Sequence, residues 1–413
     1  MDPPEKSKTR CVVVGGGPAG MMAAFLLARA GVQVLVMEKH ADFNRDFRGD
    51  TIHPSTLELM HELHLLDEFL EQPHQKLSEL CGVINGHTVP IADFSRVPTR
   101  CKFIAFMPQW DFLNFLSGHA QRFPNFQLCM EHEVVDLVVE EDRVAGVRVK
   151  TPRGELEVRA DLVVACDGRS SIVRERAGFE VREFGVPIDV LWMRLRKHDT
   201  DPPQSLGYFQ HGKLLVLIDR GDYWQCGYVI PKGGFDQIKA RGLPIFHDDL
   251  VEMADFLRDR VDELDDWSKI KLLTVQINRL RKWYREGLLC IGDAAHAMSP
   301  AGGVGINLAI QDSVAAANLL AGKLRRRPVS AIDLEKVQRR REWPAALIQH
   351  IQVFVHRHVV TGRQTSEKAS LPILPRLLKN FPVLRQIPAR LIGIGPRPEH
   401  IKAVEPAVSA AIL

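Results

Sequence analysis

The N-terminal part of the chain combines apolar runs with a glycine-rich turn. The run from Cys11 to Val14 predicts a buried strand, and Met21 to Ala30 has the composition of a helix. A second apolar run, Val32 to Met37, predicts another strand. Strand, turn, helix and strand in this order predict the opening of a Rossmann-like domain.

After about residue 180 the pattern changes to short alternating segments. Val190 to Leu195, Leu214 to Ile218 and Trp224 to Ile230 each alternate in a way that predicts an antiparallel sheet. A mainly helical stretch from His247 to Leu264 interrupts them. Residues 287–291 predict one more buried strand, followed by a glycine-rich loop and a helix.

These patterns predict a mixed α/β (α+β) fold. We expect a Rossmann-like domain interleaved with an antiparallel-sheet domain and followed by a helical C-terminal tail, because 413 residues is long for a single core. The expected divisions are 7–75, 100–180 and 280–342 for the dinucleotide-binding domain, 76–99 and 181–279 for the substrate domain, and 343–413 for the tail.

The turn from Gly15 to Gly20 fits the spacing G-x-G-x-x-G between a strand and a helix. The first glycine permits the tight turn, the second lets backbone approach a pyrophosphate, and the third lets helix and strand pack closely. Glu38 lies 18 residues beyond Gly20, at the end of the second strand, where a ribose-binding acid is expected. The motif predicts dinucleotide binding but does not separate NAD from FAD.

Two further motifs follow in order. An apolar strand leads into Asp167-Gly168, and another leads into Gly292-Asp293 and then a glycine-rich loop before Asn307. With the first turn, these three motifs span residues 11 to about 320, and together they resemble the para-hydroxybenzoate hydroxylase-like (class A) family of FAD monooxygenases.

The resemblance implies an oxidoreductase that binds FAD, takes electrons from NADPH or NADH, and uses molecular oxygen to hydroxylate an aromatic or polycyclic substrate. In that family oxygen is transferred from a flavin C4a-hydroperoxide, which needs positioning and exclusion of water more than acid–base help. The sequence accordingly shows no catalytic dyad, and the catalytic residues stay unknown. His296 is interpreted as a packing or hydrogen-bonding residue rather than a general base.

Alternatives remain open. A reductase or dehydrogenase of the same fold would not insert oxygen, and a flavin-binding protein without turnover would not be reduced. A halogenase is disfavoured, because its W-x-W-x-I-P motif survives only as Ile230-Pro231, without either tryptophan.

The cofactor-binding residues come partly from the motifs and partly from the resemblance. The resemblance places Arg48 near the FAD phosphate or ribose, Gln109 near the ribitol chain, and Asp167 where FAD meets the nicotinamide cofactor. As alternatives, Arg48 is a surface ion-pair residue and Gln109 a polar residue at a helix start. The full set is Gly15, Gly17, Pro18, Ala19, Gly20, Glu38, Lys39, Arg48, Gln109, Asp167, Asp293, Pro300, Gly303, Val304, Gly305, Ile306 and Asn307.

The antiparallel sheet is expected to cover the flavin with an apolar surface. The strand Leu214 to Ile218 carries no arginine, which favours a larger and less charged substrate than a hydroxybenzoate. Each aromatic residue here is individually more typical of a core than of a pocket. The expected pocket residues are Trp192, Tyr208, Leu217, Trp224 and Tyr228.

Composition and charge limit the expected partners and the expected location of the protein. A formal charge of +3 gives no reason to expect a nucleic-acid partner. Seven scattered cysteines without a CxxC pair favour a reducing, cytoplasmic location without a metal site. No run of 18 apolar residues predicts a spanning helix. The Pro-rich basic stretch from Leu371 to Lys402 is expected to pack over the substrate domain, so membrane contact is not expected; weak membrane contact of this stretch is the alternative interpretation. A monomer and a homodimer are both compatible with the sequence.

Overall fold

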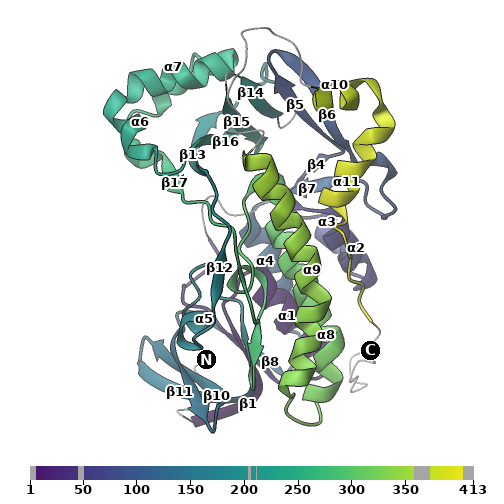
Figure 1. Ribbon diagram of the computed structural model, residues 1–413. Helices are drawn as coiled ribbons and strands as arrows, with labels where there is room; N and C mark the ends of the chain where they lie inside the picture. Colours follow the sequence, from purple (N-terminus) through teal and green to yellow (C-terminus); the bar gives the residue numbers. More distant parts are fainter. Residues whose placement is uncertain (1–5, 45–50, 203–205, 211, 358–372, 403–413) are drawn as a thin grey trace.

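The computed structural model describes residues 6–44, 51–202, 206–210, 212–357 and 373–402. Figure 1 shows an elongated molecule with one sheet in its lower half and a second sheet at its upper end. Strands alternate with helices in the lower part, and the upper part is mainly antiparallel. The expected mixed α/β fold is therefore confirmed.

The lower sheet has eight strands and is built on parallel pairing at its centre. Its main path runs β19-β20-β11-β1-β2-β8; β10 pairs antiparallel with β11, and β9 pairs antiparallel with β10. All four residues of β2 are buried, as expected for a strand with a helix layer on its face. The strands are β1 (Lys6–Val14), β2 (Val34–Met37), β8 (Phe126–Cys129), β9 (Glu133–Glu140), β10 (Arg143–Thr151), β11 (Gly154–Ala165), β19 (Tyr284–Arg285) and β20 (Leu288–Cys290).

Helices pack on this sheet. One core joins strand residues to α1 (Pro18–Arg29), α4 (Gln109–Ala120) and α8 (Val304–Leu324). Helix α1 begins three residues before the predicted Met21, because Pro18 has the fixed φ suited to a first helical position. By length and composition Ala301–Leu324 is the one described segment that could cross a membrane, but 83% of its most apolar window is buried. It is the central helix of the core.

Helix α9 (Ala331–Val355) runs antiparallel to α8 through 25 residues and reaches the upper sheet (Figure 1). It continues without a break across residue 342, where the sequence placed a domain boundary. The other short helices of this region are α2 (Pro54–Glu62), α3 (Leu66–Leu70) and α5 (Ile172–Arg176).

The upper sheet has seven strands in the order β17-β13-β16-β15-β14-β5-β6. Helices α6 (Phe235–Arg241) and α7 (Leu243–Met253) cover its outer face, the upper-left part of Figure 1. The strands are β5 (Glu79–Ile84), β6 (His87–Asp93), β13 (Ile188–Arg196), β14 (Leu206–Gln210), β15 (Lys213–Asp219), β16 (Tyr223–Pro231) and β17 (Lys271–Leu273).

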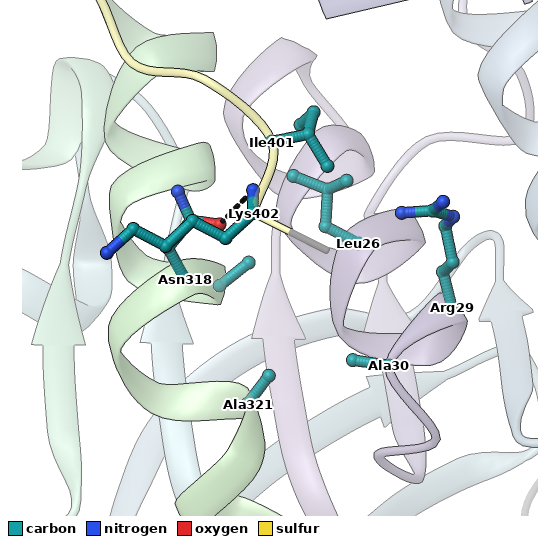
Figure 2. A pocket seen from close by; sticks show the side chains of 8 residues that line it. Leu26, Arg29, Ala30, Asn318, Ala321, Ile401 and Lys402 are labelled. Atoms are coloured by element: carbon teal, nitrogen blue, oxygen red, sulfur yellow. Dashed lines mark hydrogen bonds between the residues drawn. The ribbon is translucent and has the colours of Figure 1, made fainter. Parts of the chain in front are cut away.

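Two small sheets lie between these layers: β3 (Thr51–Ile52), β7 (Ile104–Phe106) and β4 (Gln75–Leu77) form one, and β12 (Val181–Glu183) pairs with β18 (Asn278–Leu280). The tail continues as α10 (Ile373–Asn380) and α11 (Gln386–Gly393) and then as an extended segment to residue 402. The end of that segment lies beside α1 and α8, and its residues Ile401 and Lys402 line a pocket together with these two helices (Figure 2). Asn318 Nδ2 donates to His400 O at 2.8 Å, and Lys402 N donates to Asn318 Oδ1 at 3.1 Å.

Candidate active site

The glycine turn after β1 forms a tight backbone corner at the start of α1. Gly15 has φ +98°, which favours glycine, and a Cβ added to Gly20 would meet Gly15 O at 1.9 Å. A Cβ on Gly17 would meet nothing within 4 Å, and Gly17 caps α1 without a side-chain hydrogen bond. The start of α1 therefore has no side-chain cap and is open at Gly17, as a phosphate site requires.

Glu38 lies at the end of β2, directly beside this turn. Its Oε2 accepts from Gly16 N at 2.7 Å and its Oε1 accepts from His40 N at 3.0 Å. The carboxylate is thus held at the corner where the ribose of a dinucleotide is expected. The neighbouring Lys39 is exposed.

Asp167 comes to the same corner from β11. A Cβ on Gly15 would lie 3.0 Å from Asp167 Cα, so the two motifs touch through backbone. The Asp167 carboxylate accepts from Ser171 Oγ at 2.6 Å and from Val173 N at 3.2 Å. Burial raises the pKa of this carboxyl, and its hydrogen bonds oppose the shift. In this structure the side chain mainly anchors the start of α5.

The Gly292-Asp293 loop follows β20 and packs against α1 and α8. Gly292 has φ +60°, and a Cβ there would meet Ala19 at 3.0 Å and Ala309 at 3.2 Å. Arg169 Nη2 donates to Asp293 Oδ2 at 3.2 Å, which joins the second motif to the third. The buried Nη1 of Arg169 has no partner among the described residues. A cation with a spare donor beside Asp293 is suited to a polar cofactor chain.

The glycine-rich loop before α8 provides a second helix N-terminus. Gly302 and Gly303 have φ of +79° and +62°, and a Cβ on Gly303 would meet Thr51 Oγ1 at 2.1 Å. No side chain caps α8, so the N–H groups of Val304 and its neighbours are left for another partner. The expected residues Pro300, Gly305 and Ile306 flank or begin this helix.

The side chain of Asn307 is hydrogen-bonded to the segment before α2. Its Oδ1 accepts from His53 N at 2.9 Å and from Thr56 Oγ1 at 2.7 Å, and its Nδ2 donates to Thr51 O at 3.0 Å. The side chain therefore clamps the segment before α2 to the glycine-rich loop.

Of the other two residues carried over from the resemblance besides Asp167, Gln109 is the first residue of α4 and is partly buried. Arg48 lies outside the described residues. The structure thus brings the glycine turn, Glu38, Asp167 and the loop from Asp293 to Asn307 onto one side of the parallel sheet, around α1 and α8.

A buried charge network behind the third motif was missed from the sequence. Asp312 accepts from His296 Nε2 at 2.5 Å, from Arg341 Nε at 3.0 Å and from Gly292 N at 3.1 Å. Arg341 Nη1 in turn lies 3.2 Å from Glu399 Oε1. Burial by itself raises the pKa of the Asp312 carboxyl, but His296 and Arg341 outweigh it and hold that pKa below its usual value. The available signal was Asp312 itself, the only carboxylate in the mainly apolar sequence of α8.

The five expected pocket residues lie on two different faces of the upper sheet. Tyr208, Leu217, Trp224 and Tyr228 belong to the core between the sheet and α7. The ring of Tyr228 lies 5.6 Å from that of Phe246 in α7, and Trp224 is 1% exposed. These four residues therefore fill the outer core, and only Trp192 lies on the inner face.

The inner face is apolar yet only half-buried. Along β15 the inner residues Leu214, Val216 and Ile218 are partly exposed, whereas Leu215 and Leu217 between them are buried. In a strand the two sets point to opposite faces. Apolar side chains that stay partly exposed on a face turned toward the rest of the protein suit a ligand surface.

Helix α9 places this inner face next to the glycine-rich loop that precedes α8. Gln352 Nε2 donates to Ser299 O and to Ala301 O, both at 3.0 Å. The next residue, Val353, packs in the cluster that contains Trp192. One turn of helix therefore touches both the glycine-rich loop and the inner face.

Comparison with known proteins agrees with this arrangement. The family described as FAD binding domain matches residues 8–350. The chain is 32% identical over 394 residues to the 6-methylpretetramide 4-monooxygenase of Streptomyces rimosus, covering 94% of this chain and 93% of that protein. It is 30% identical to a 12-dehydrotetracycline 5-monooxygenase/anhydrotetracycline 6-monooxygenase of Streptomyces rimosus subsp. rimosus, covering 73% of this chain and 60% of that protein.

Among solved structures, the anhydrotetracycline hydroxylase OxyS of Streptomyces rimosus superposes with a TM-score of 0.74 at 25% identity, covering 94% of this chain and 76% of that one. The fold, the family match and the similarity to the 6-methylpretetramide 4-monooxygenase all indicate the same family. The chain belongs to the FAD binding domain family and, within it, to the FAD-dependent aromatic monooxygenases that resemble para-hydroxybenzoate hydroxylase.

Proposed function

We propose that this monooxygenase hydroxylates a flat polycyclic aromatic substrate bound between the glycine-rich loop and the inner face of the upper sheet. The half-exposed apolar inner face beside that loop is the observation that carries the proposal. The named activities of two relatives, on 6-methylpretetramide and on anhydrotetracycline, support a polycyclic substrate class.

The residues present suit FAD. Two uncapped helix N-termini, at Gly17 and Gly303, offer N–H groups to the pyrophosphate and to the electron-rich edge of the ring system. Glu38 and Asp293 offer carboxylates to ribose and ribitol hydroxyls. Bound FAD supplies the redox chemistry, taking a hydride from NAD(P)H and activating oxygen for transfer to the substrate ring.

A cross-strand row on the inner face gives the pocket its shape. Gly82, Gly207, Val216, Gly227 and Trp192 are successive partners across five strands. A Cβ on Gly227 would meet the Trp192 ring at 3.0 Å, whereas a Cβ on Gly207 would meet nothing within 4 Å. The inner face, which would form the floor of the pocket, therefore has no side chain at Gly207, and the indole of Trp192 lies at one end of this row of residues. A broad planar substrate fits such a floor better than a small benzoate does.

The finer assignments are also proposals. We infer NADPH or NADH as the reductant, a cytoplasmic location supported by seven free buried cysteines, and a monomer or homodimer. The three-part domain division remains a proposal as well, with α9 shared between the parts.

Labelled oxygen tests the function. With ¹⁸O₂ and NADPH or NADH, the protein should transfer one labelled atom to a polycyclic phenol such as a naphthacene derivative, and the reduction of FAD should be faster with that substrate bound. Consumption of NAD(P)H with no label in the product would favour the reductase alternative. Coupled turnover with small benzoates alone would refute the polycyclic proposal.

A further inference from the structure

The C-terminal helices carry a cluster of exposed apolar side chains, here called the tail surface: Leu377, Phe381, Val383 and Ile387. Their exposed fractions are 39%, 56%, 70% and 67%. They lie on α10, on the short 3-10 helix Pro382–Arg385 and on α11, at the right of the upper half in Figure 1. The inner side of the tail packs against β6, whereas these four side chains are exposed.

The tail surface is held in place by polar contacts on its inner side. Arg385 Nε donates to Leu378 O at 2.9 Å, and Arg385 Nη1 lies 3.4 Å from Glu79 Oε1 on β5. His53 Nδ1 lies 2.7 Å from Ile392 O. The small residues Ala389 and Gly393 face inward on α11. Ile387 therefore points outward from an anchored helix.

The charges around the tail surface favour one kind of binding partner over another. Residues 373–393 contain the cations Arg376, Lys379, Arg385 and Arg390 and no aspartate or glutamate. Lys379 and Arg390 are exposed beside the apolar side chains. A symmetric contact with a second copy would bring these like charges together, which is unfavourable. Apolar side chains flanked by cations are typical of helices that lie at the boundary of an anionic bilayer.

We propose that the tail surface docks on an anionic lipid bilayer, with Phe381, Val383 and Ile387 at the boundary between headgroups and acyl chains. Lys379 and Arg390 pair with lipid phosphates in this arrangement. The binding is peripheral, because the helices are short and lie along the protein surface. It is independent of the chemistry proposed above and is measured without turnover.

Sedimentation with lipid vesicles tests the proposal on the full-length, FAD-loaded protein. We expect binding to vesicles of phosphatidylcholine with 30% phosphatidylglycerol at low salt, at least tenfold weaker binding to pure phosphatidylcholine, and weakening by added salt. The triple variant Phe381→Ser/Val383→Ser/Ile387→Ser should lose binding at least tenfold while keeping its flavin and its melting temperature. Ile332→Ser is the matched control, because Ile332 is 69% exposed on α9, and it should bind like the unmodified protein.

A second variant tests the role of charge. Lys379→Gln/Arg390→Gln should weaken binding to the anionic vesicles and reduce its dependence on salt. The proposal is overturned if the unmodified protein leaves anionic vesicles unbound at low salt, or if the triple variant binds as well as Ile332→Ser does. It is also overturned if vesicles do not bind and the serine substitutions instead abolish a dimer seen by sedimentation equilibrium, which would assign the surface to a second copy.

Discussion

Replacing Asp312 by asparagine removes a carboxylate that links the Gly292 loop to α9. Asp312 and Arg341 side chains are each 1% exposed, and their atoms lie 3.0 Å apart. Breaking a buried ion pair on one side costs about 3–5 kcal/mol, because the other charge stays buried without its partner. Arg341 keeps Glu399 at 3.2 Å, so we expect the lower end, about 3 kcal/mol.

This loss is measurable on the apoprotein by urea unfolding and by melting temperature. At roughly 2 °C per kcal/mol for a large domain, Asp312→Asn should melt about 6 °C lower. Asp236→Asn is the matched control, because the Asp236 side chain is 89% exposed and pairs only with Lys239 three residues on. That control should lose less than about 0.5 kcal/mol.

The same substitution should reduce retention of FAD on gel filtration, because Gly292 N loses a charged acceptor and the loop of Asp293 is held less firmly. A destabilisation below about 1 kcal/mol would show that the buried charges do not stabilise this loop as argued. A large destabilisation with unchanged FAD affinity would restrict the network to a structural role.

Three further perturbations give independent checks. Gly20→Ala should abolish FAD binding in a fluorescence titration, since its Cβ would lie 1.9 Å from Gly15 O and α1 would have to shift; a normal affinity would contradict the phosphate-site assignment. Gly207→Val fills the open floor of the inner face, so KM for a polycyclic substrate should rise about tenfold while small phenols are unaffected, and equal effects on both would argue against the pocket. Burial lowers the pKa of His53 to about 4 from 6.5, so the unfolded chain binds the proton first as the pH falls. The contribution of neutral His53 to the free energy of unfolding is complete above pH 6.5 and is lost toward pH 4. The free energy of unfolding should therefore fall by up to about 1.4 kcal/mol per pH unit in this range, and His53→Gln should remove that dependence in urea titrations.

The sequence by itself determined those features that depend only on neighbouring residues in the chain. The glycine turn, Glu38 and the Asp293 loop could be located from spacing alone, because each depends on backbone freedom or on the end of a buried strand. The alternating segments likewise predicted the antiparallel sheet, since period two is a property of a single strand.

Tertiary structure decided which residues of that sheet fill its outer core and which lie on its inner face. Both faces of β15 carry apolar side chains, one set against α7 and the other toward the glycine-rich loop, so alternation alone could not assign Trp224 and Tyr228 to the outer core. The Asp312 network draws on four segments far apart in the chain, from His296 to Glu399, and exists only once α8, α9 and the tail are packed. Local spacing fixes where a backbone can approach a cofactor, whereas the environment of a side chain depends on which distant surface covers it.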